Sequence, residues 1–289
     1  MKFLVLGCNG MAGHTVSIYL KEQGYEVDGF AREQSPFVKT ITGDARDLKL
    51  VREIIRSCGY STVVNCIGVL NQSAENDHET AVFLNAYFPQ FLAKAAAGTD
   101  TQIIQISTDC VFSGNKGGYK EGDLPDGTLF YDRSKALGEV WDDKDVTFRN
   151  SIIGPDMKKT GIGLVNWFMQ QEGSVHGYKN AIWTGQTTLQ LAKTIERAAV
   201  SRVHGLHHMV PENSISKYEL LLLFNKYLRA KPVAVVPEDR FKIDKSLVRT
   251  DFTSFNYKIP SYETQIKELG NWMRAHRDLY PHYRLQSSS

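Results

Sequence analysis

The chain has 289 residues, 42% of them hydrophobic and 23% charged, and 34 basic side chains against 32 acidic ones leave a formal net charge of +2. This size and composition predict one large domain or two smaller ones with a sizeable core, and they argue against disorder. The balanced charge also argues against a nucleic-acid-binding surface or a polybasic membrane surface.

No membrane segment is predicted, because the longest dense apolar run, residues 220–224, is far shorter than the roughly 20 residues that cross a bilayer. The apolar run at residues 3–6 is too short for the core of a signal peptide. We therefore expect a cytosolic protein.

The first half of the chain alternates short apolar runs with longer amphipathic ones. The short runs predict strands at residues 3–6, 26–30, 62–66, 102–107 and 147–149. Runs with apolar residues three and four positions apart predict helices at residues 11–23, 48–58, 79–97 and 132–141. Strand and helix in alternation predict an α/β fold with a parallel sheet and right-handed crossovers.

Beyond Pro155 the pattern is weaker. It predicts helices at residues 189–200, 217–228 and 262–276, a strand at 205–210, and a disordered polar end at 286–289. The four cysteines, which lie in or beside apolar stretches without metal-type spacing, are predicted to be reduced structural thiols: Cys8, Cys58, Cys66 and Cys110.

The first chemical signal is a GxxGxxG sequence at residues 7–13, between a predicted strand and a predicted helix. Gly7 permits the tight turn, Gly10 lets the backbone approach a pyrophosphate, and Gly13 allows close helix–strand packing. The phosphates then bind free N–H groups at the helix start. This pattern predicts a doubly wound, Rossmann-type sheet that binds a dinucleotide through residues Gly7, Asn9, Gly10, Met11 and Gly13.

The end of the second strand favours NADP over NAD. An NAD-binding fold usually places Asp or Glu there for the ribose hydroxyls, whereas this chain has Arg32, which can pair with the extra phosphate of NADP. A solvated arginine beside Glu33 is the alternative. After the third strand, Asp44 and its neighbour Ala45 are predicted to contact the adenine.

Three further polar residues form a second chemical signal. Thr108 follows a strand, and Tyr131 and Lys135 lie four positions apart, on one face of a predicted helix. A phenol with a reference pKa near 10 is a poor acid at neutral pH, and we expect the Lys135 ammonium to lower the pKa of Tyr131. Lys135 can also bind the nicotinamide ribose, and the Thr108 hydroxyl can bind a substrate carbonyl.

These residues, behind the glycine turn, resemble those of the extended short-chain dehydrogenase/reductases. STDCVFSG at residues 107–114 is similar to STDYVFDG of the dTDP-4-dehydrorhamnose reductases, and YDRSK with the later GE at residues 131–139 is similar to their YGRSK...GE. The resemblance implies that the cofactor also contacts Cys66, Ile67, Gly68 and Asn85. It implies substrate contacts at Val111, Phe112, Asn150 and Trp183, and we add Arg249 as the candidate diphosphate ligand.

The resemblance implies a cofactor domain at residues 1–148 plus about 186–210, and a substrate lobe at about 149–185 and 211–285. It implies reduction of the keto group of a nucleotide-linked 4-keto-6-deoxy sugar, a step toward cell-surface polysaccharide precursors. NADP(H) is the preferred cofactor and NAD(H) the second choice. The expected partners are the nucleotide sugar and, as an open option, a second copy of the chain.

Two departures bear on the substrate. Ile152 stands where rhamnose-forming reductases usually have Trp, and Cys110 replaces their Tyr. Cys110 also holds the position of the glutamate that related 4,6-dehydratases use, which argues against a dehydratase. A nucleotide-sugar epimerase stays open, as does a non-catalytic NADP-binding subunit like that of methionine adenosyltransferase. The nearby histidines lack a carboxylate partner at ligand spacing, so no metal is predicted: His204, His207 and His208.

Overall fold

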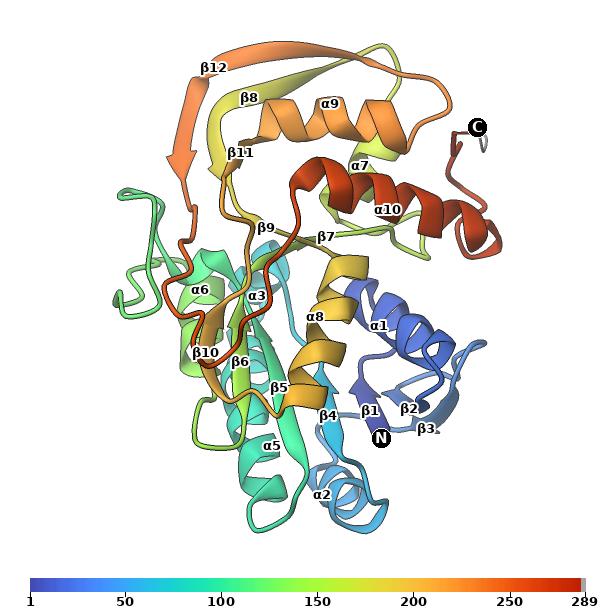
Figure 1. Ribbon diagram of the computed structural model, residues 1–289, viewed down its shortest axis with the longest axis vertical. Coiled ribbons are helices and arrows are strands. Elements are labelled where there is room, and N and C mark those ends of the chain that lie inside the picture. The colour runs from blue at the N-terminus through green and yellow to red at the C-terminus, as the bar shows by residue number, and fades with distance from the viewer. Residues whose placement is uncertain (287–289) are drawn as a thin grey trace.

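The central sheet of the computed structural model, which describes residues 1–286, has seven parallel strands in the order β10-β6-β5-β4-β1-β2-β3 (Figure 1). Its strands are β1 Lys2–Leu6, β2 Glu26–Ala31, β3 Lys39–Thr42, β4 Thr62–Asn65, β5 Gln102–Ser107, β6 Val146–Arg149 and β10 Gly205–His208. The helices around it are α1 Met11–Glu22, α2 Leu48–Ser57, α3 Asn71–Asn76, α4 His78–Ala81, α5 Phe88–Ala96, α6 Phe130–Leu137 and α8 Thr188–Ser201. The predicted doubly wound α/β fold is confirmed.

Both faces of the sheet are covered, which explains why its strands are continuous apolar runs. In β1, Phe3 and Val5 pack in a cluster with side chains of α1 and α8. Leu4 and Leu6 belong to a second cluster with α2 and α5 on the opposite face. Successive side chains of a strand point to opposite faces, so each residue of β1 is buried on one side or the other.

Two predicted helices differ from those observed. The helix expected at residues 79–97 is divided into α4, a π-helical turn at Val82–Tyr87, and α5. The helix expected to reach residue 141 ends at Leu137. Glu139 lies two residues beyond that end and is drawn into a buried ion pair with Arg149 of β6, so the chain leaves the helical path there.

A smaller lobe lies beside the carboxyl end of the sheet (Figure 1). It contains a three-stranded sheet, β11-β8-β12, and a separate β7-β9 pair. The bounds are β7 Ser151–Ile153, β8 Ser174–Trp183, β9 Gly185–Thr187, β11 Ile215–Ser216, β12 Ala234–Asp244, α7 Leu164–Met169, α9 Lys217–Tyr227 and α10 Tyr262–Ala275; short 3-10 turns occur at Asp109–Val111 and Arg277–Leu279. Apolar side chains of the three helices and β8 form its core, together with Ile18 of α1.

β10 extends the parallel sheet beside β6. Of the polar end expected to be disordered, residues 287–289 lie outside the described part of the chain. Within residues 1–286, no helix combines the length and the apolar character needed to span a bilayer.

Candidate functional site

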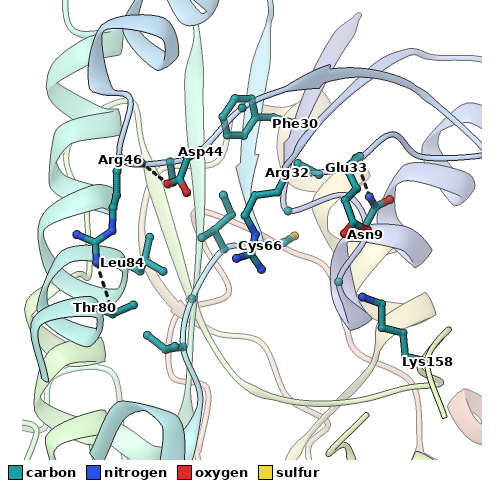
Figure 2. A pocket seen from close by; sticks show the side chains of 18 residues that line it. Asn9, Phe30, Arg32, Glu33, Asp44, Arg46, Cys66, Thr80, Leu84 and Lys158 are labelled. Atoms are coloured by element: carbon teal, nitrogen blue, oxygen red, sulfur yellow. Dashed lines mark hydrogen bonds between the residues drawn. The ribbon is translucent and has the colours of Figure 1, made fainter. Parts of the chain in front are cut away.

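A cavity of about 580 Å³ opens where the strand order reverses, between β1 and β4. Ligands of doubly wound folds bind at this kind of switch point. Nine of the residues predicted to contact the cofactor line the cavity: Gly7, Asn9, Gly10, Arg32, Asp44, Ala45, Cys66, Ile67 and Gly68 (Figure 2). Met11, Gly13, Asn85, Tyr131 and Lys135 are not among the lining residues.

The glycine turn positions the start of α1 at this cavity. Gly7 has φ +78°, and a Cβ on it would lie 3.0 Å from Cγ1 of Ile67. A Cβ on Gly13 would lie only 2.1 Å from the carbonyl oxygen of Gly7, so only glycine allows the helix to pack this closely. The first turn of α1 carries no acidic residue, which leaves its N–H groups and positive dipole end suited to an anion.

Arg32, predicted to select NADP, and Asp44, predicted to contact the adenine, both line the cavity. Arg32 is exposed, and no carboxylate in residues 1–286 lies within ion-pairing distance of it. Asp44 is also exposed, and its Oδ1 accepts a hydrogen bond of 2.8 Å from the backbone N–H of Arg46 (Figure 2). The Asp44 carboxylate is therefore open to solvent rather than buried.

Asn85 has a different role from the one predicted. It is buried in the π-helical turn, where its Nδ2 donates to the Val69 carbonyl at 3.0 Å and to Oγ of Ser134 at 3.2 Å. Its Oδ1 accepts from the Val69 N–H at 2.9 Å. The side chain thus joins the loop after β4 to helix α6, and we assign it to positioning that loop rather than to direct cofactor contact.

Thr108, Tyr131 and Lys135 come together beside the ends of β4 and β5. All three are buried, at 8%, 6% and 8% exposure. The Thr108 hydroxyl donates to Oδ1 of Asp109 at 3.1 Å and accepts from the N–H of Cys110 at 3.1 Å. Nζ of Lys135 donates to the carbonyl of Ile106 in β5 at 2.7 Å.

The expected effect of Lys135 on the Tyr131 phenol is wrong for this structure. Burial raises the pKa of Tyr131 well above its ordinary value, and the nearby Thr108 hydroxyl opposes this shift only in part. Burial lowers the pKa of Lys135 to about 8, because its ammonium is desolvated, while the nearby Glu139 charge acts in the opposite direction. The Tyr131 phenol therefore keeps its proton at neutral pH; it is a weaker acid than a free tyrosine but can still protonate an alkoxide, which is a stronger base.

A buried ion pair lies next to the end of β5, directly before Thr108. Arg149 binds Glu139 through two hydrogen bonds of 2.7 and 2.6 Å, and the side chains of Arg149 and Glu139 are 3% and 1% exposed. Oγ of Ser107 donates to the same carboxylate at 2.7 Å. Glu139 therefore fixes the end of β5 directly before Thr108. The GE sequence was noted only for its resemblance to the reductase motif. Nothing in the sequence indicated that Glu139 pairs with Arg149.

Three of the predicted substrate residues have side chains that are engaged within the protein. Val111 and Phe112 are fully buried in an apolar cluster, with Phe112 stacked on Tyr119 at 4.2 Å, so their side chains serve packing. Arg249 donates to the backbone carbonyls of Asp251, Tyr257 and Phe255. Those contacts engage the guanidinium in holding its own loop.

The other two predicted substrate residues lie at strand ends, Asn150 in the seven-stranded sheet and Trp183 in the three-stranded sheet. Asn150 directly follows β6, is 1% exposed, and has neither side-chain oxygen nor nitrogen paired within residues 1–286. Trp183 ends β8 and is also buried, with Nζ of Lys217 at 4.8 Å from its ring centroid. The Asn150 side chain can thus still form hydrogen bonds, and the Trp183 ring forms a cation–π contact with Lys217.

Sequence reasoning missed a charged group next to Thr108. Asp109 is buried, and burial raises its pKa, although the charges of Lys217 and Lys245 act against that shift. Burial lowers the pKa of Lys217 to about 8, opposed by Asp109 and Cys110. Lys217 and Lys245 come from the smaller lobe, so two cations approach the Thr108 side of the site from across the domain boundary.

The cysteines and histidines have ordinary surroundings. The four cysteines are free thiols, of which Cys8 is buried and Cys58 exposed. Ring nitrogens of His207 and His208 contact backbone carbonyls, those of His204 and Val248. Within residues 1–286 no group of three or more His, Cys, Asp or Glu side chains is arranged to hold a metal ion.

The sheet, the glycine turn at the switch point and the group of Thr108, Tyr131 and Lys135 define an extended short-chain dehydrogenase/reductase. Comparison with known families narrows this class. The chain belongs to the family described as RmlD substrate binding domain, whose family model matches residues 1–153.

Relatives cover the chain to different extents. A probable low-salt glycan biosynthesis reductase of Haloferax volcanii is 33% identical over 143 residues, about half (48%) of each chain. A dTDP-4-dehydrorhamnose reductase of Aggregatibacter actinomycetemcomitans is 26% identical over 250 residues, 82% of each chain. The crystal structure of the Bacillus anthracis dTDP-4-dehydrorhamnose reductase in complex with NADP superposes with a TM-score of 0.77 at 20% identity, over 93% of this chain and 98% of that one, which supports the fold.

Proposed function

We propose that this protein is an NADPH-dependent reductase of the keto group of a nucleotide-linked 4-keto-6-deoxy sugar. The observation that carries the proposal is the buried group of Thr108, Tyr131 and Lys135 next to the dinucleotide-sized cavity. The Aggregatibacter relative, named as a reductase of this kind over most of its length, supports the substrate class.

The residues present fit a dinucleotide. The cavity has a turn in which side chains would clash at Gly7 and Gly13, so a pyrophosphate can approach the backbone there. Arg32 is a free cation at the place where the extra phosphate of NADP would lie, and Asp44 offers a carboxylate oxygen on the adenine side. Asp44, Ala45 and Gly68 would contact the adenosine and nicotinamide ends of the molecule.

A bound nicotinamide supplies a hydride to the ketone carbon. Thr108 orients the carbonyl by a hydrogen bond to its oxygen. Tyr131, kept protonated by its raised pKa, gives its proton to the developing alkoxide at that oxygen. Lys135, four residues after Tyr131 on α6, is a buried cation that would bind the nicotinamide ribose.

The substrate lies between the cofactor domain, residues 1–148 plus about 186–210, and the lobe formed by about 149–185 and 211–285. Asn150 offers its unpaired amide to the sugar. Lys217 and Lys245, whose charges act on Asp109 from the smaller lobe, are the candidates for the substrate diphosphate in place of Arg249. The product would be a precursor of a cell-surface polysaccharide, made in the cytosol.

The test is a screen of UDP-, dTDP- and GDP-linked 4-keto-6-deoxy sugars for oxidation of NADPH. The proposal expects one or more of these sugars to be reduced with equimolar consumption of NADPH. An epimerase would instead interconvert sugar isomers without net consumption of cofactor. A regulatory subunit would bind NADPH and reduce no sugar in the panel, and either result would overturn the proposal.

A further inference from the structure

One cation at the cavity comes from the smaller lobe. Lys158 lies in the loop between β7 and α7, far along the chain from the glycine turn, yet it lines the same cavity as Asn9, Gly10 and Arg32. Figure 2 shows its side chain turned toward the cavity, on the side of Asn9 and Glu33. Lys158 belongs to none of the sequence motifs described above.

The backbone of this loop is held in place. Nδ2 of Asn166 donates to the carbonyl oxygens of Lys159 at 3.1 Å and Gly161 at 2.5 Å. The Tyr283 hydroxyl donates to Asn166 at 2.7 Å and accepts from the N–H of Asp156 at 2.9 Å. These hydrogen bonds join the loop, helix α7 and the C-terminal segment, and they fix the position of the backbone around Lys158.

The same loop touches the start of α1. A Cβ placed on Gly163 would lie 3.0 Å from Sδ of Met11, the first residue of that helix. The loop therefore lies against the helix end at which a dinucleotide phosphate is proposed to bind. Lys158 is the residue of this loop that lines the cavity.

Lys158 forms no ion pair in the described residues, although its charge opposes the rise that burial causes in the pKa of Asp156 in the same loop. The side chain is exposed, and within residues 1–286 it forms no ion pair and donates no hydrogen bond. Arg32 stands at the same cavity with its charge equally free. Two unpaired cations from different lobes, together with an uncapped helix start, are an arrangement that favours a phosphate group.

We propose that Lys158 binds a phosphate of the bound dinucleotide, so that the cofactor links the two lobes. This inference rests on the proposed function. The phosphate can be the pyrophosphate, which NADPH and NADH share, or the extra phosphate of NADPH. These two sources make different predictions for the two cofactors.

The experiment compares Lys158→Met with Lys159→Met in the full chain. Lys159 is also exposed but does not line the cavity, so it is a matched control for loss of one lysine from the loop. Affinities for NADPH and NADH are measured by fluorescence titration, and thermal midpoints check that each variant is folded. Lys158→Met should bind cofactor about tenfold more weakly than the parent, the low end for a charge-assisted contact, and Lys158→Arg should largely restore binding.

Equal weakening for both cofactors assigns Lys158 to the pyrophosphate, and weakening of NADPH alone assigns it to the extra phosphate. Lys158→Met that binds both cofactors as well as Lys159→Met would overturn the inference while leaving the proposed function intact. A parent protein that binds neither cofactor would overturn both.

Discussion

Replacing Glu139 by Gln should strongly destabilise the protein. The carboxylate accepts bonds of 2.7 and 2.6 Å from Arg149 and one of 2.7 Å from Ser107, and both charged side chains are at most 3% exposed. The variant keeps the shape but leaves the Arg149 charge without its counter-ion in a buried place. Breaking a buried pair in this way costs about 3–5 kcal/mol.

The loss is measured by urea and thermal unfolding. For domains of somewhat smaller size, 1 kcal/mol corresponds to roughly 2–4 °C, so the midpoint should fall by about 6–20 °C. Glu268→Gln is the control, because Glu268 pairs with Lys193 at 2.9 Å while their side chains are 40% and 28% exposed. A pair this exposed contributes at most about 1 kcal/mol.

A double variant, Glu139→Gln with Arg149→Met, tests the cause. It has no unpaired buried charge, so it should lose clearly less than the sum of the two single variants. The Glu139 charge also raises the pKa of Lys135, so Glu139→Gln should shift any loss of cofactor affinity at high pH toward lower pH. Equal stability losses for Glu139→Gln and Glu268→Gln would refute the reasoning.

Three further outcomes follow from the cofactor site. Arg32→Ala should weaken NADPH binding about tenfold and leave NADH nearly unchanged, whereas identical titration curves of the parent for both cofactors would show that Arg32 does not select between them. Gly13→Ala should abolish measurable cofactor binding and lower the thermal midpoint, because its Cβ would lie 2.1 Å from a backbone oxygen; normal binding by this variant would contradict the packing argument. Cofactor affinity should fall as the pH rises through about 8, where the Lys135 ammonium loses its proton, and Lys135→Arg should extend binding to higher pH; a flat profile up to pH 10 would exclude Lys135 as the cation involved.

The cofactor half of the fold could be predicted because its strands are buried on both faces. Residues such as Val5 and Leu6 then form apolar runs, and the glycine turn marks the first crossover. β8 and β12 were not predicted, since β12 is largely exposed and carries charges and Pro237. Its position depends on parallel pairing with β8, a contact distant in sequence that local patterns do not encode.

The site divides in the same way. Motifs identified residues that follow β1, β2 and β4, and the structure has Asn9, Arg32 and Cys66 line one cavity. Phe112 is part of the STDCVFSG motif, but a place in a motif does not determine exposure, and the side chain packs inward. Lys158 was missed because only the three-dimensional approach of the two lobes brings it to the glycine turn.

The most direct test of the central claim follows the hydrogen itself. NADPH carrying deuterium in the transferred position at C4 of the nicotinamide is incubated with the nucleotide 4-keto-6-deoxy sugars, and the products are analysed by mass spectrometry and NMR. The proposed mechanism predicts one deuterium on the former keto carbon for each NADPH oxidised. It also predicts that Tyr131→Phe binds NADPH normally but forms this product about 10²- to 10⁴-fold more slowly. Tight NADPH binding without deuterium in any sugar, or an undiminished rate in Tyr131→Phe, would contradict the account.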